Sequence, residues 1–175
     1  MRPRPISNGM NVTLIGMPGA GKSFVGRRLA EKLGLDFLDV DRAIIEPTHG
    51  KPLQDILDEM GEQKFITMEG QAIIVGTIGK RDIVISPGGS VVYRPETMEH
   101  LKEISTVIYL KVSFPTLETR IGTVGRGIVG LKGKTFKELY DERTPLYEKY
   151  ADVTIETEGR NTDDIVAEMI GILED

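Results

Sequence analysis

The sequence predicts an α/β fold, a three-layer sandwich built around a central parallel sheet of about five strands. Two observations support this prediction. Short apolar runs alternate with longer amphipathic stretches along the 175 residues, and a glycine-rich loop separates the first run from the first stretch. In such folds the ligands bind beyond the carboxyl ends of the strands. The residues that follow each strand are therefore the first candidates for a functional site.

The expected elements follow from hydrophobic periodicity. The strands are expected at residues 13–15, 37–39, 83–86, 107–112 and 153–156. The helices are expected at residues 23–33, 52–60 extending through 65–78, 95–104, 115–121, 136–150 and 162–173. Neither a linker nor a repeat divides the chain, so residues 10–175 are predicted to form one domain after a flexible arm of residues 1–9.

The loop from Gly16 to Ser23 fits the phosphate-binding pattern G-x-x-x-x-G-K-[ST] between a strand and a helix. Its glycines let backbone N–H groups turn toward phosphate oxygens, and the helix points its positive end at the same anion. Lys22 is expected to reach the β- and γ-phosphates, and Ser23 to ligate Mg²⁺. An incidental glycine-rich turn does not account for all four fixed positions. The loop therefore predicts binding of a nucleoside triphosphate.

The helix after this loop is predicted to be amphipathic. Its apolar side is expected to carry Phe24, Val25, Leu29, Ala30 and Leu33.

Two further strand ends carry candidate site residues. Asp39 and Asp41 follow the second strand, and alternation along an extended segment would point them the same way. Two acids beside a phosphate site suit a metal ligand and a proton acceptor, although Asp41 could instead cap a helix. Gly88 and Gly89 follow the third strand and would let a ligand approach backbone N–H groups, although an ordinary turn is the favoured explanation when this segment is taken alone.

Residues 122–133 hold five glycines with Arg126 near the centre. In a phosphate-binding protein this composition predicts a lid, about residues 122–134, that brings positive charge to the transferring phosphoryl group. An ordinary surface loop is the alternative. Arg143 lies between acids on an expected helix, a pattern typical of a solvated ion pair.

The composition narrows the classes of function. A net charge of −5 argues against a broad nucleic-acid-binding face, and the lack of cysteine excludes disulfides and thiolate chemistry. No apolar run is long enough to span a bilayer, and the first nine residues lack the apolar stretch of a signal peptide. These features fit a cytoplasmic enzyme that acts without a nucleic acid or a membrane, and no feature marks an interface for oligomers.

The order of these motifs resembles the shikimate kinase family, a branch of the P-loop kinases with a nucleoside-monophosphate-kinase-like fold. The resemblance runs from Met10 to about Leu173. It rests on the segments Gly16–Ser23, Phe37–Asp41, Gly61–Phe65 with Glu69, Gly88-Gly89, Gly125-Arg126 and Arg143–Tyr147. Apart from the first, each segment is weak by itself, but their order along the chain is specific.

The resemblance implies transfer of the γ-phosphoryl group of ATP to the 3-hydroxyl of shikimate. Ser23 and, through water, Asp39 would hold Mg²⁺. Lys22 would bind the phosphates, and Asp41 would bind the attacking hydroxyl and assist its deprotonation. The nucleotide-binding residues would be Gly16, Gly19, Ala20, Gly21, Lys22, Ser23 and Phe24, with Arg120, Arg160 and Asn161 near the adenine.

The same resemblance implies an acceptor region at about residues 42–70, completed by residues from later in the chain. Gly88 and Gly89 would offer N–H groups to the acceptor, Arg143 would pair with its carboxylate, and Arg126 would be the lid arginine. Family members are often monomers, and a monomer is expected here.

The chain departs from the family pattern in the acceptor site and the lid. Ile66 stands where the family has a second carboxylate-binding arginine, so the acidic partner Glu69 lacks its usual neighbour. Ser90 replaces a third glycine and adds a hydroxyl where the acceptor approaches the backbone. The lid reads Arg126-Gly127-Ile128 in place of Arg-Pro-Leu, and Thr162 replaces a proline near the adenine.

Three functions remain open on these residues. The first is a shikimate-kinase-like enzyme of the aromatic amino-acid precursor pathway. The second is a kinase of the same family that acts on another small hydroxylated metabolite. The third, from a different class, is a non-catalytic ATP-binding regulatory module.

Overall fold

Five parallel strands form the centre of the protein in a computed structural model that describes residues 11–124 and 128–175. The strands are β1 (Asn11–Ile15), β2 (Asp36–Asp39), β3 (Ile83–Ser86), β4 (Ser105–Lys111) and β5 (Val153–Glu156). Their order in the sheet is β2-β3-β1-β4-β5, and every neighbouring pair is parallel. The predicted fold class and all five predicted strands are confirmed.

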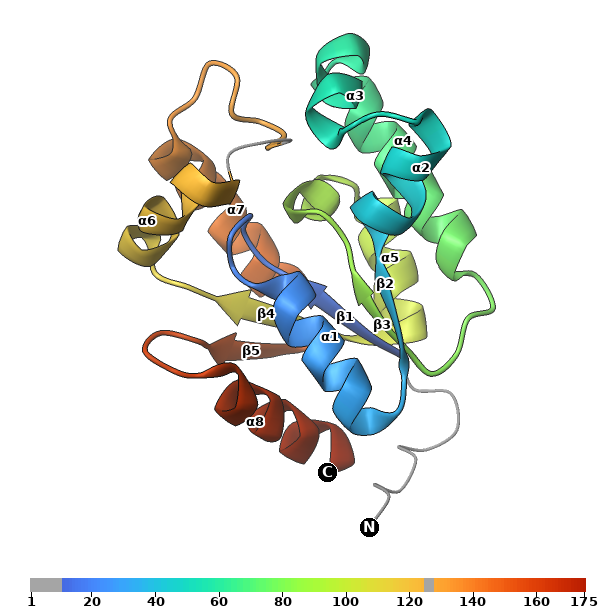
Figure 1. The fold of residues 1–175 in the computed structure, drawn as a ribbon, viewed down its shortest axis with the longest axis vertical. Helices are drawn as coiled ribbons and strands as arrows, with labels where there is room; N and C mark the ends of the chain where they lie inside the picture. The colour runs from blue at the N-terminus through green and yellow to red at the C-terminus, as the bar shows by residue number, and fades with distance from the viewer. Residues whose placement is uncertain (1–10, 125–127) are drawn as a thin grey trace.

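Helices connect the strands and cover both faces of the sheet (Figure 1). They are α1 (Lys22–Leu33), the π-helix η1 (Asp41–Ile45), α2 (Glu46–His49), α3 (Leu53–Met60), α4 (Glu62–Thr77), the 3₁₀-helix η2 (Gly89–Tyr93), α5 (Pro95–Ile104), α6 (Phe114–Val124), α7 (Phe136–Tyr150) and α8 (Thr162–Glu174). The sequence did not predict η1, α2 or η2. These short helices have too few residues to show a periodic pattern.

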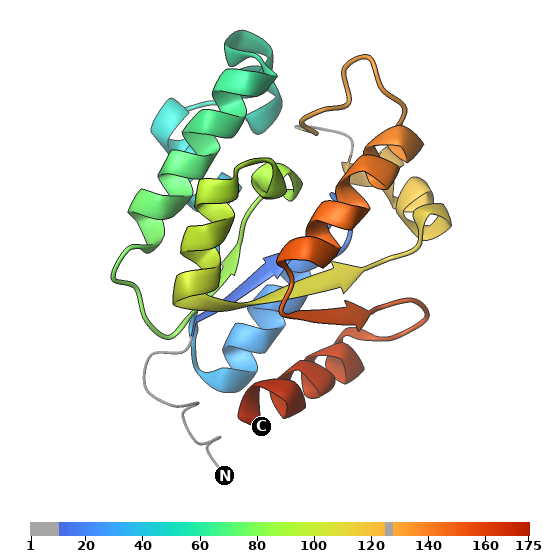
Figure 2. The same cartoon turned by 180° about the vertical axis from the view of Figure 1, so that it is seen from behind.

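Two hydrophobic cores lie on opposite faces of the sheet, because successive side chains of a strand alternate between its faces. In β4, Ile108 and Leu110 join the core under α1 and α8, whereas Val107 and Tyr109 join the larger core under α4, α5 and α7. Figure 2 shows the second face, with α5 and α7 lying over the strands. Both faces are covered, and the three central strands β3, β1 and β4 are accordingly buried over most of their length.

Two details of the predicted helices were wrong. The helix expected from residue 52 to residue 78 is two helices, because Gly61 between them has φ 82°, a value that ends α3. Phe24 is not on the buried side of α1: the ring is 69% exposed, whereas Val25, Leu29, Ala30 and Leu33 are buried as expected.

Beyond the carboxyl ends of the strands, α2 and α3 rise on one side and the loop of residues 128–135 rises on the other (Figure 1). The expected lid therefore begins inside α6, since residues 122–124 belong to that helix. Within residues 11–124 and 128–175, no helix combines the length and the apolar character needed to cross a bilayer.

Candidate active site

The phosphate loop connects β1 to α1 at the centre of the sheet. Gly16, Gly19 and Gly21 all have positive φ values, of 154°, 85° and 89°. A Cβ on Gly16 would also lie 2.9 Å from the Leu110 carbonyl oxygen, so this position excludes a side chain on two grounds. No side chain caps the first turn of α1. The N–H groups of that turn are therefore available to an anion.

Lys22 is buried and turns back onto the loop from which it extends. Its Nζ donates hydrogen bonds to the carbonyl oxygens of Gly16 at 2.8 Å and Met17 at 3.0 Å. Burial lowers the pKa of Lys22 to about 8, while the nearby Asp41 carboxylate opposes this shift. A bound phosphate would place further negative charge next to the buried ammonium group and would stabilise its protonated form.

Ser23 and Asp39 meet at the base of the loop, as the sequence predicted. The Ser23 hydroxyl donates a hydrogen bond of 2.8 Å to Asp39 Oδ2. Both groups are hard oxygen donors, and Mg²⁺ commonly binds through one or two protein ligands together with phosphate oxygens and water. In the described part of the chain, no group of three or more His, Asp or Glu residues could enclose a metal. Ser23 and Asp39 therefore fit Mg²⁺ that arrives with a nucleotide.

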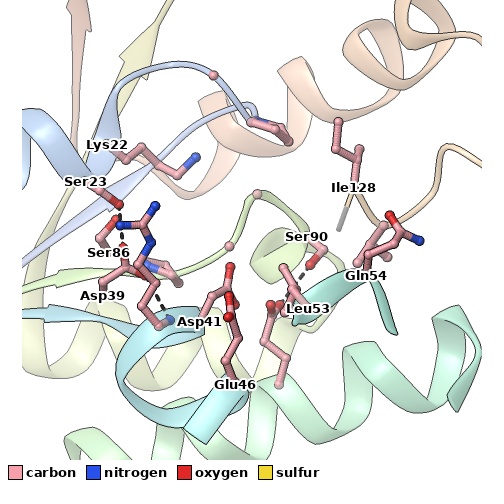
Figure 3. A pocket seen from close by; sticks show the side chains of 18 of the residues that line it. Lys22, Ser23, Asp39, Asp41, Glu46, Leu53, Gln54, Ser86, Ser90 and Ile128 are labelled. Carbon is pink, nitrogen blue, oxygen red and sulfur yellow. Dashed lines mark hydrogen bonds between the residues drawn. The ribbon is translucent and has the colours of Figure 1, made fainter. Parts of the chain in front are cut away.

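A pocket of about 880 Å³ extends from this loop across the carboxyl edge of the sheet (Figure 3). The lining brings together sequence-predicted residues from five separate segments: Gly19, Gly21, Lys22, Ser23, Phe24, Asp39, Asp41, Glu69, Gly88, Gly89, Ser90 and Arg143. Gly16 and Ala20 are not among the lining residues. They belong to the framework of the loop, where Gly16 accepts from Lys22 and the Ala20 N–H donates to the Met17 carbonyl.

Asp41 opens η1 directly after β2, and its side chain reaches into the pocket (Figure 3). It does not cap that helix: the N-cap is Val40, and no side-chain cap is formed. Strand alternation is also not what aligns Asp41 with Asp39, because β2 ends at Asp39. Burial and the charge on Asp39 raise the pKa of Asp41 to about 6. The carboxyl group is thus a stronger proton acceptor than an exposed aspartate.

Glu69 lies on α4 and is 2% exposed, so it does not face water. It accepts a hydrogen bond of 2.8 Å from the Ser90 hydroxyl and forms a second side-chain hydrogen bond with Asp41. Burial, followed by the Asp41 charge, raises the pKa of Glu69. The sequence identified no partner for Glu69. In the structure its two hydrogen-bond partners are Ser90 and Asp41, and neither is a cation.

The two glycines after β3 are required by close packing. Gly88 has φ −64°, which any residue can adopt, but a Cβ there would lie 2.8 Å from Glu69 Oε2 and 3.3 Å from Asp41 Oδ2. A Cβ on Gly89 would lie 3.0 Å from Arg143 Nη1 and 3.0 Å from Pro18 Cδ. The absence of a side chain at these two positions therefore lets Glu69, Asp41 and Arg143 pack close to the backbone.

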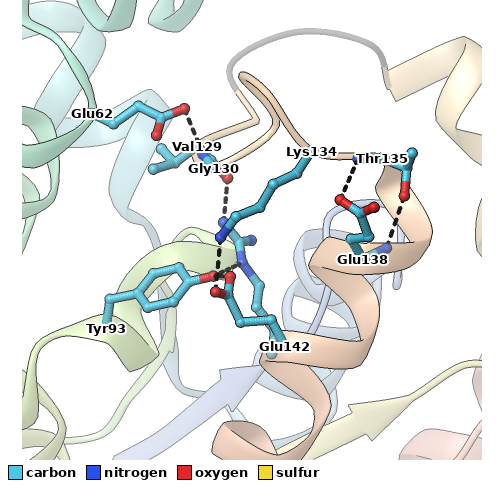
Figure 4. A network of polar contacts seen from close by, with 9 residues as sticks. Glu62, Tyr93, Val129, Gly130, Lys134, Thr135, Glu138 and Glu142 are labelled. Atoms are coloured by element: carbon cyan, nitrogen blue, oxygen red, sulfur yellow. Dashed lines mark hydrogen bonds and ion pairs between the residues drawn. The ribbon is translucent and has the colours of Figure 1, made fainter.

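Arg143 is 1% exposed, so the interpretation as a solvated ion pair was wrong. Its Nε donates to the Tyr93 hydroxyl at 3.2 Å, its Nη2 donates to the Val129 carbonyl, and the guanidinium lies over the Tyr93 ring. The neighbouring Glu142 pairs instead with Lys134 at 2.8 Å and accepts from Tyr93. Figure 4 shows this network around Tyr93, Val129 and Glu142. It holds Arg143, which lines the pocket.

The same network anchors residues 128–135, the described part of the predicted lid. Glu62 Oε1 at the start of α4 accepts a hydrogen bond of 2.9 Å from the Gly130 N–H (Figure 4). At the other end, Thr135 and Glu138 form a capping box that begins α7. Ile128 and Val129 are buried and line the pocket. Arg126, the predicted lid arginine, lies outside the described residues.

Besides Gly16 and Ala20, four other predicted site residues do not line the pocket. Ile66 packs against the hydrophobic core. Arg120 donates from Nη1 to the Gly19 carbonyl at 3.1 Å, which places it beside the phosphate loop. Arg160 bonds the Glu156 carbonyl and pairs with Glu168, and Asn161 caps α8 by accepting from the Asp164 N–H. An adenine contact for Arg120, Arg160 and Asn161 stays a prediction.

The lining also includes residues that sequence reasoning did not single out: Pro18, Arg42, Glu46, Pro52, Leu53, Gln54, Asp55, Ser86, Pro87, Ile128 and Val129. Those from Arg42 to Asp55 lie in η1, α2 and α3 or cap α3, inside the segment expected to bind the acceptor. Their position after the second strand was the only signal. No short motif marks them.

The fold and the pocket together define a P-loop protein of the kinase type, in which a phosphate loop faces a second set of polar side chains. A family model described as shikimate kinase matches residues 18–174. The shikimate kinase of Persephonella marina is 39% identical over 162 residues, which is 92% of this chain and 97% of that protein. That of Thermodesulfovibrio yellowstonii is 38% identical over 163 residues, 91% of this chain and 92% of that protein.

Solved structures agree with these relatives. The shikimate kinase from Acinetobacter baumannii in complex with shikimate superposes with a TM-score of 0.81 at 29% identity, covering 94% of this chain and 92% of that one. Shikimate kinase from Aquifex aeolicus superposes with a TM-score of 0.78 at 28% identity, covering 94% of this chain and 96% of that one. The chain belongs to the shikimate kinase family, which consists of ATP-dependent phosphotransferases that act on an alcohol group.

Proposed function

We propose that this protein transfers the γ-phosphoryl group of ATP to the 3-hydroxyl of shikimate, in the cytoplasm and as a monomer, for aromatic amino-acid biosynthesis. One observation carries the proposal: Asp41, a buried carboxyl group, shares a pocket with the phosphate-loop residues Lys22 and Ser23 and with the buried cation Arg143. Phosphoryl transfer needs a positioned hydroxyl, charge neutralisation and little covalent chemistry from the protein. These side chains meet that need.

Each side chain has a role that follows from its contacts. Lys22 exchanges the carbonyls of Gly16 and Met17 for the β- and γ-phosphates. Ser23 and, through water, Asp39 would hold Mg²⁺, which would neutralise phosphate charge. Asp41 accepts the proton of the attacking hydroxyl. Arg143 pairs with the acceptor's carboxylate, and Arg126 brings charge from the lid.

The acceptor region of residues 42–70 and the lid of residues 122–134 supply the remaining enclosure. Leu53 and Ile128 line the pocket from these two sides, and closing them together would exclude water from the reacting phosphoryl group. Neither a nucleic acid nor a membrane takes part in the reaction.

A second candidate is a kinase for another small hydroxylated metabolite. One observation favours it: the position expected for a second carboxylate-binding arginine is Ile66, which does not line the pocket. A hydrogen bond to a charged group contributes roughly 1.5–3 kcal/mol, so the loss of one arginine weakens carboxylate binding by about one to two powers of ten.

The test is ADP release from Mg-ATP with a panel of acceptors: shikimate, quinate, polyols, other hydroxy acids and amino-alcohols. We expect shikimate-dependent turnover, with a KM for shikimate higher than that of family members that have the second carboxylate-binding arginine. Turnover with a different acceptor alone would establish the second candidate. ATP binding with silence across the panel would leave the non-catalytic ATP-binding module as the better account.

A further inference from the structure

Tyr93 contacts Arg143 without lining the pocket itself. Tyr93 is the last residue of η2, Arg143 lies on α7, and only the arginine is among the residues that line the pocket. The guanidinium carbon of Arg143 lies over the Tyr93 ring, 5.1 Å from the ring centroid, and its Nε donates a hydrogen bond of 3.2 Å to the Tyr93 hydroxyl. The arginine is therefore held by both the ring and the hydroxyl of one side chain.

The Tyr93 hydroxyl can act toward Arg143 only as an acceptor. A tyrosine hydroxyl has a single hydrogen, and Tyr93 donates it to Glu142 Oε2 at 2.6 Å (Figure 4). Glu142 is fixed in turn by an ion pair of 2.8 Å with Lys134. The lysine thus orients the glutamate, the glutamate takes the hydroxyl hydrogen, and the oxygen of Tyr93 is left to face the arginine.

Neutral groups orient Arg143. They are the Tyr93 hydroxyl, the Val129 carbonyl, which accepts from Nη2, and the Tyr147 hydroxyl, which interacts with the guanidinium group. No carboxylate of residues 11–124 and 128–175 forms an ion pair with Arg143: Glu142, its neighbour in sequence, pairs with Lys134, and Glu69 accepts from Ser90. Arg143 is 1% exposed, so it is a buried cation without an ionic partner in the described chain. A buried charge is unfavourable until an anion pairs with it.

We propose that Tyr93 is a positioning residue for the carboxylate of the acceptor, an inference that rests on the kinase function proposed above. Tyr93 fixes the guanidinium group through Nε and keeps Glu142 one hydroxyl away, so the charge of Arg143 is available to the acceptor. Nη1 of Arg143 lies beside Gly89, 3.0 Å from the point that a Cβ would occupy there, and Gly89 lines the pocket. The carboxylate is bound from this side, and Tyr93 does not touch it.

Tyr93→Phe tests the hydroxyl alone, because phenylalanine keeps the ring under the guanidinium group. We expect the KM for shikimate to rise about five- to tenfold, while kcat and the KM for ATP stay within about twofold of the parent protein. The carboxylate is remote from the transferring phosphoryl group, so its contacts are equally strong in the ground state and the transition state. Loss of such a contact raises KM and leaves kcat unchanged.

The uncharged amide of shikimate separates positioning of Arg143 from a general change of pocket shape. Tyr93→Phe should change kcat/KM for the amide less than about twofold, because the amide lacks the anion that Arg143 pairs with. The matched control is Tyr140→Phe, which removes a hydroxyl from the same helix as Arg143. The Tyr140 hydroxyl donates to the Val112 carbonyl at 3.4 Å, and its loss should leave all kinetic constants unaltered.

Three kinetic results would overturn the proposal. An unchanged KM for shikimate in Tyr93→Phe would show that the hydroxyl does not support carboxylate binding. An equal loss of kcat/KM for shikimate and for its amide would mean that Tyr93 acts on the shape of the pocket. An effect confined to kcat or to the KM for ATP would place its action at the phosphate loop.

A second measurement does not depend on turnover. NMR follows the exchange of the Arg143 Nε–H with solvent, which is slow while the group is buried and hydrogen-bonded. We expect exchange at least about tenfold faster in Tyr93→Phe than in the parent protein and Tyr140→Phe. Unchanged exchange would overturn the proposal even if shikimate is phosphorylated. Faster exchange would support the contact even if the acceptor panel identifies a different acceptor with a carboxylate.

Discussion

Asp39, Asp41 and Glu69 form a cluster of carboxyl groups, and Lys22 and Arg143 supply the nearby positive charge. Burial and charge act unequally on Asp41 and Glu69, so neighbouring acids can have different roles. Asp39 binds the Ser23 hydroxyl, Glu69 retains a proton, and Asp41 is left as the acceptor.

Substitution of Asp41 by asparagine should separate binding from chemistry. Asp41→Asn keeps the size of the side chain but removes its capacity to take up a proton, so kcat should fall by roughly 10²–10⁴-fold while the dissociation constant for ATP changes little. Steady-state kinetics and ATP titration measure the two quantities. Asp36→Asn, at the exposed beginning of the same strand, is the control and should behave like the parent protein. An unchanged kcat in Asp41→Asn would remove Asp41 from the reaction.

At the scale of elements, the strands were predictable and the short helices were not. The predicted bounds of each strand nearly match the observed ones, and the phosphate loop follows a motif with four fixed positions. By contrast, η1, α2 and η2 span four or five residues each and follow no period. The pocket residues they carry, such as Glu46, could be located only after the chain was folded.

Among the individual site residues, too, some positions were predictable from the sequence and others were not. Ser23 and Asp39 were predicted to lie together, and they do, because Ser23 is in the first turn of the helix after β1 and Asp39 ends β2 at the same edge of the sheet. The burial of Arg143 and the pairing of Glu69 with Ser90 were not predictable. Both depend on contacts between segments separated by 14 to 21 residues or more, and sequence spacing does not report such contacts.

The hydrogen bond between Glu62 on α4 and Gly130 in the loop of residues 128–135 can be tested by substitution. Glu62→Ala removes the acceptor of the Gly130 N–H, so the loop should close less readily and the KM for shikimate should rise by roughly three- to tenfold. Glu62→Gln retains an oxygen acceptor and is the matched control, with a smaller effect. Identical steady-state constants for Glu62→Ala and the parent protein would show that this bond does not support the loop.

Over the whole molecule, the buried acids make stability depend on pH. The folded state keeps the Glu69 proton up to a pH of about 8, whereas the unfolded chain releases it near the ordinary value of 4.5. Between these values the folded state binds more protons, so the free energy of unfolding falls as pH rises. Asp41 acts in the same direction up to a pH of about 6, and Lys22 titrates above this window.

Urea unfolding at pH 5, 6.5 and 8 measures this dependence. The parent protein should lose stability steadily across the series, and Glu69→Gln should lose less, because its side chain does not titrate. The stability of the parent protein relative to that of Glu69→Gln should therefore fall toward pH 8. Parallel curves would mean that Glu69 is ionised throughout.

The core under α1 and α8 should be as important to the fold as the core beneath the pocket. Met169 on α8 is fully buried there, and Met98 on α5 is fully buried on the other face. Each substitution to alanine should cost about 2–5 kcal/mol of unfolding free energy. Chemical denaturation of the two variants, at one pH, measures both values. A near-neutral Met169→Ala would show that α8 contributes little to the second core.

The packing of α8 against α1 also bears on how the protein is made. The helix that carries Lys22 and Ser23 is synthesised before α8, but its apolar side is covered by Ile165, Val166 and Met169, and its Arg28 pairs with Asp163. All four of those partners lie in α8. An apolar surface of α1 therefore stays uncovered during synthesis until α8 has been made. A chain that stops before α8 would carry the complete nucleotide motif on an unsupported helix.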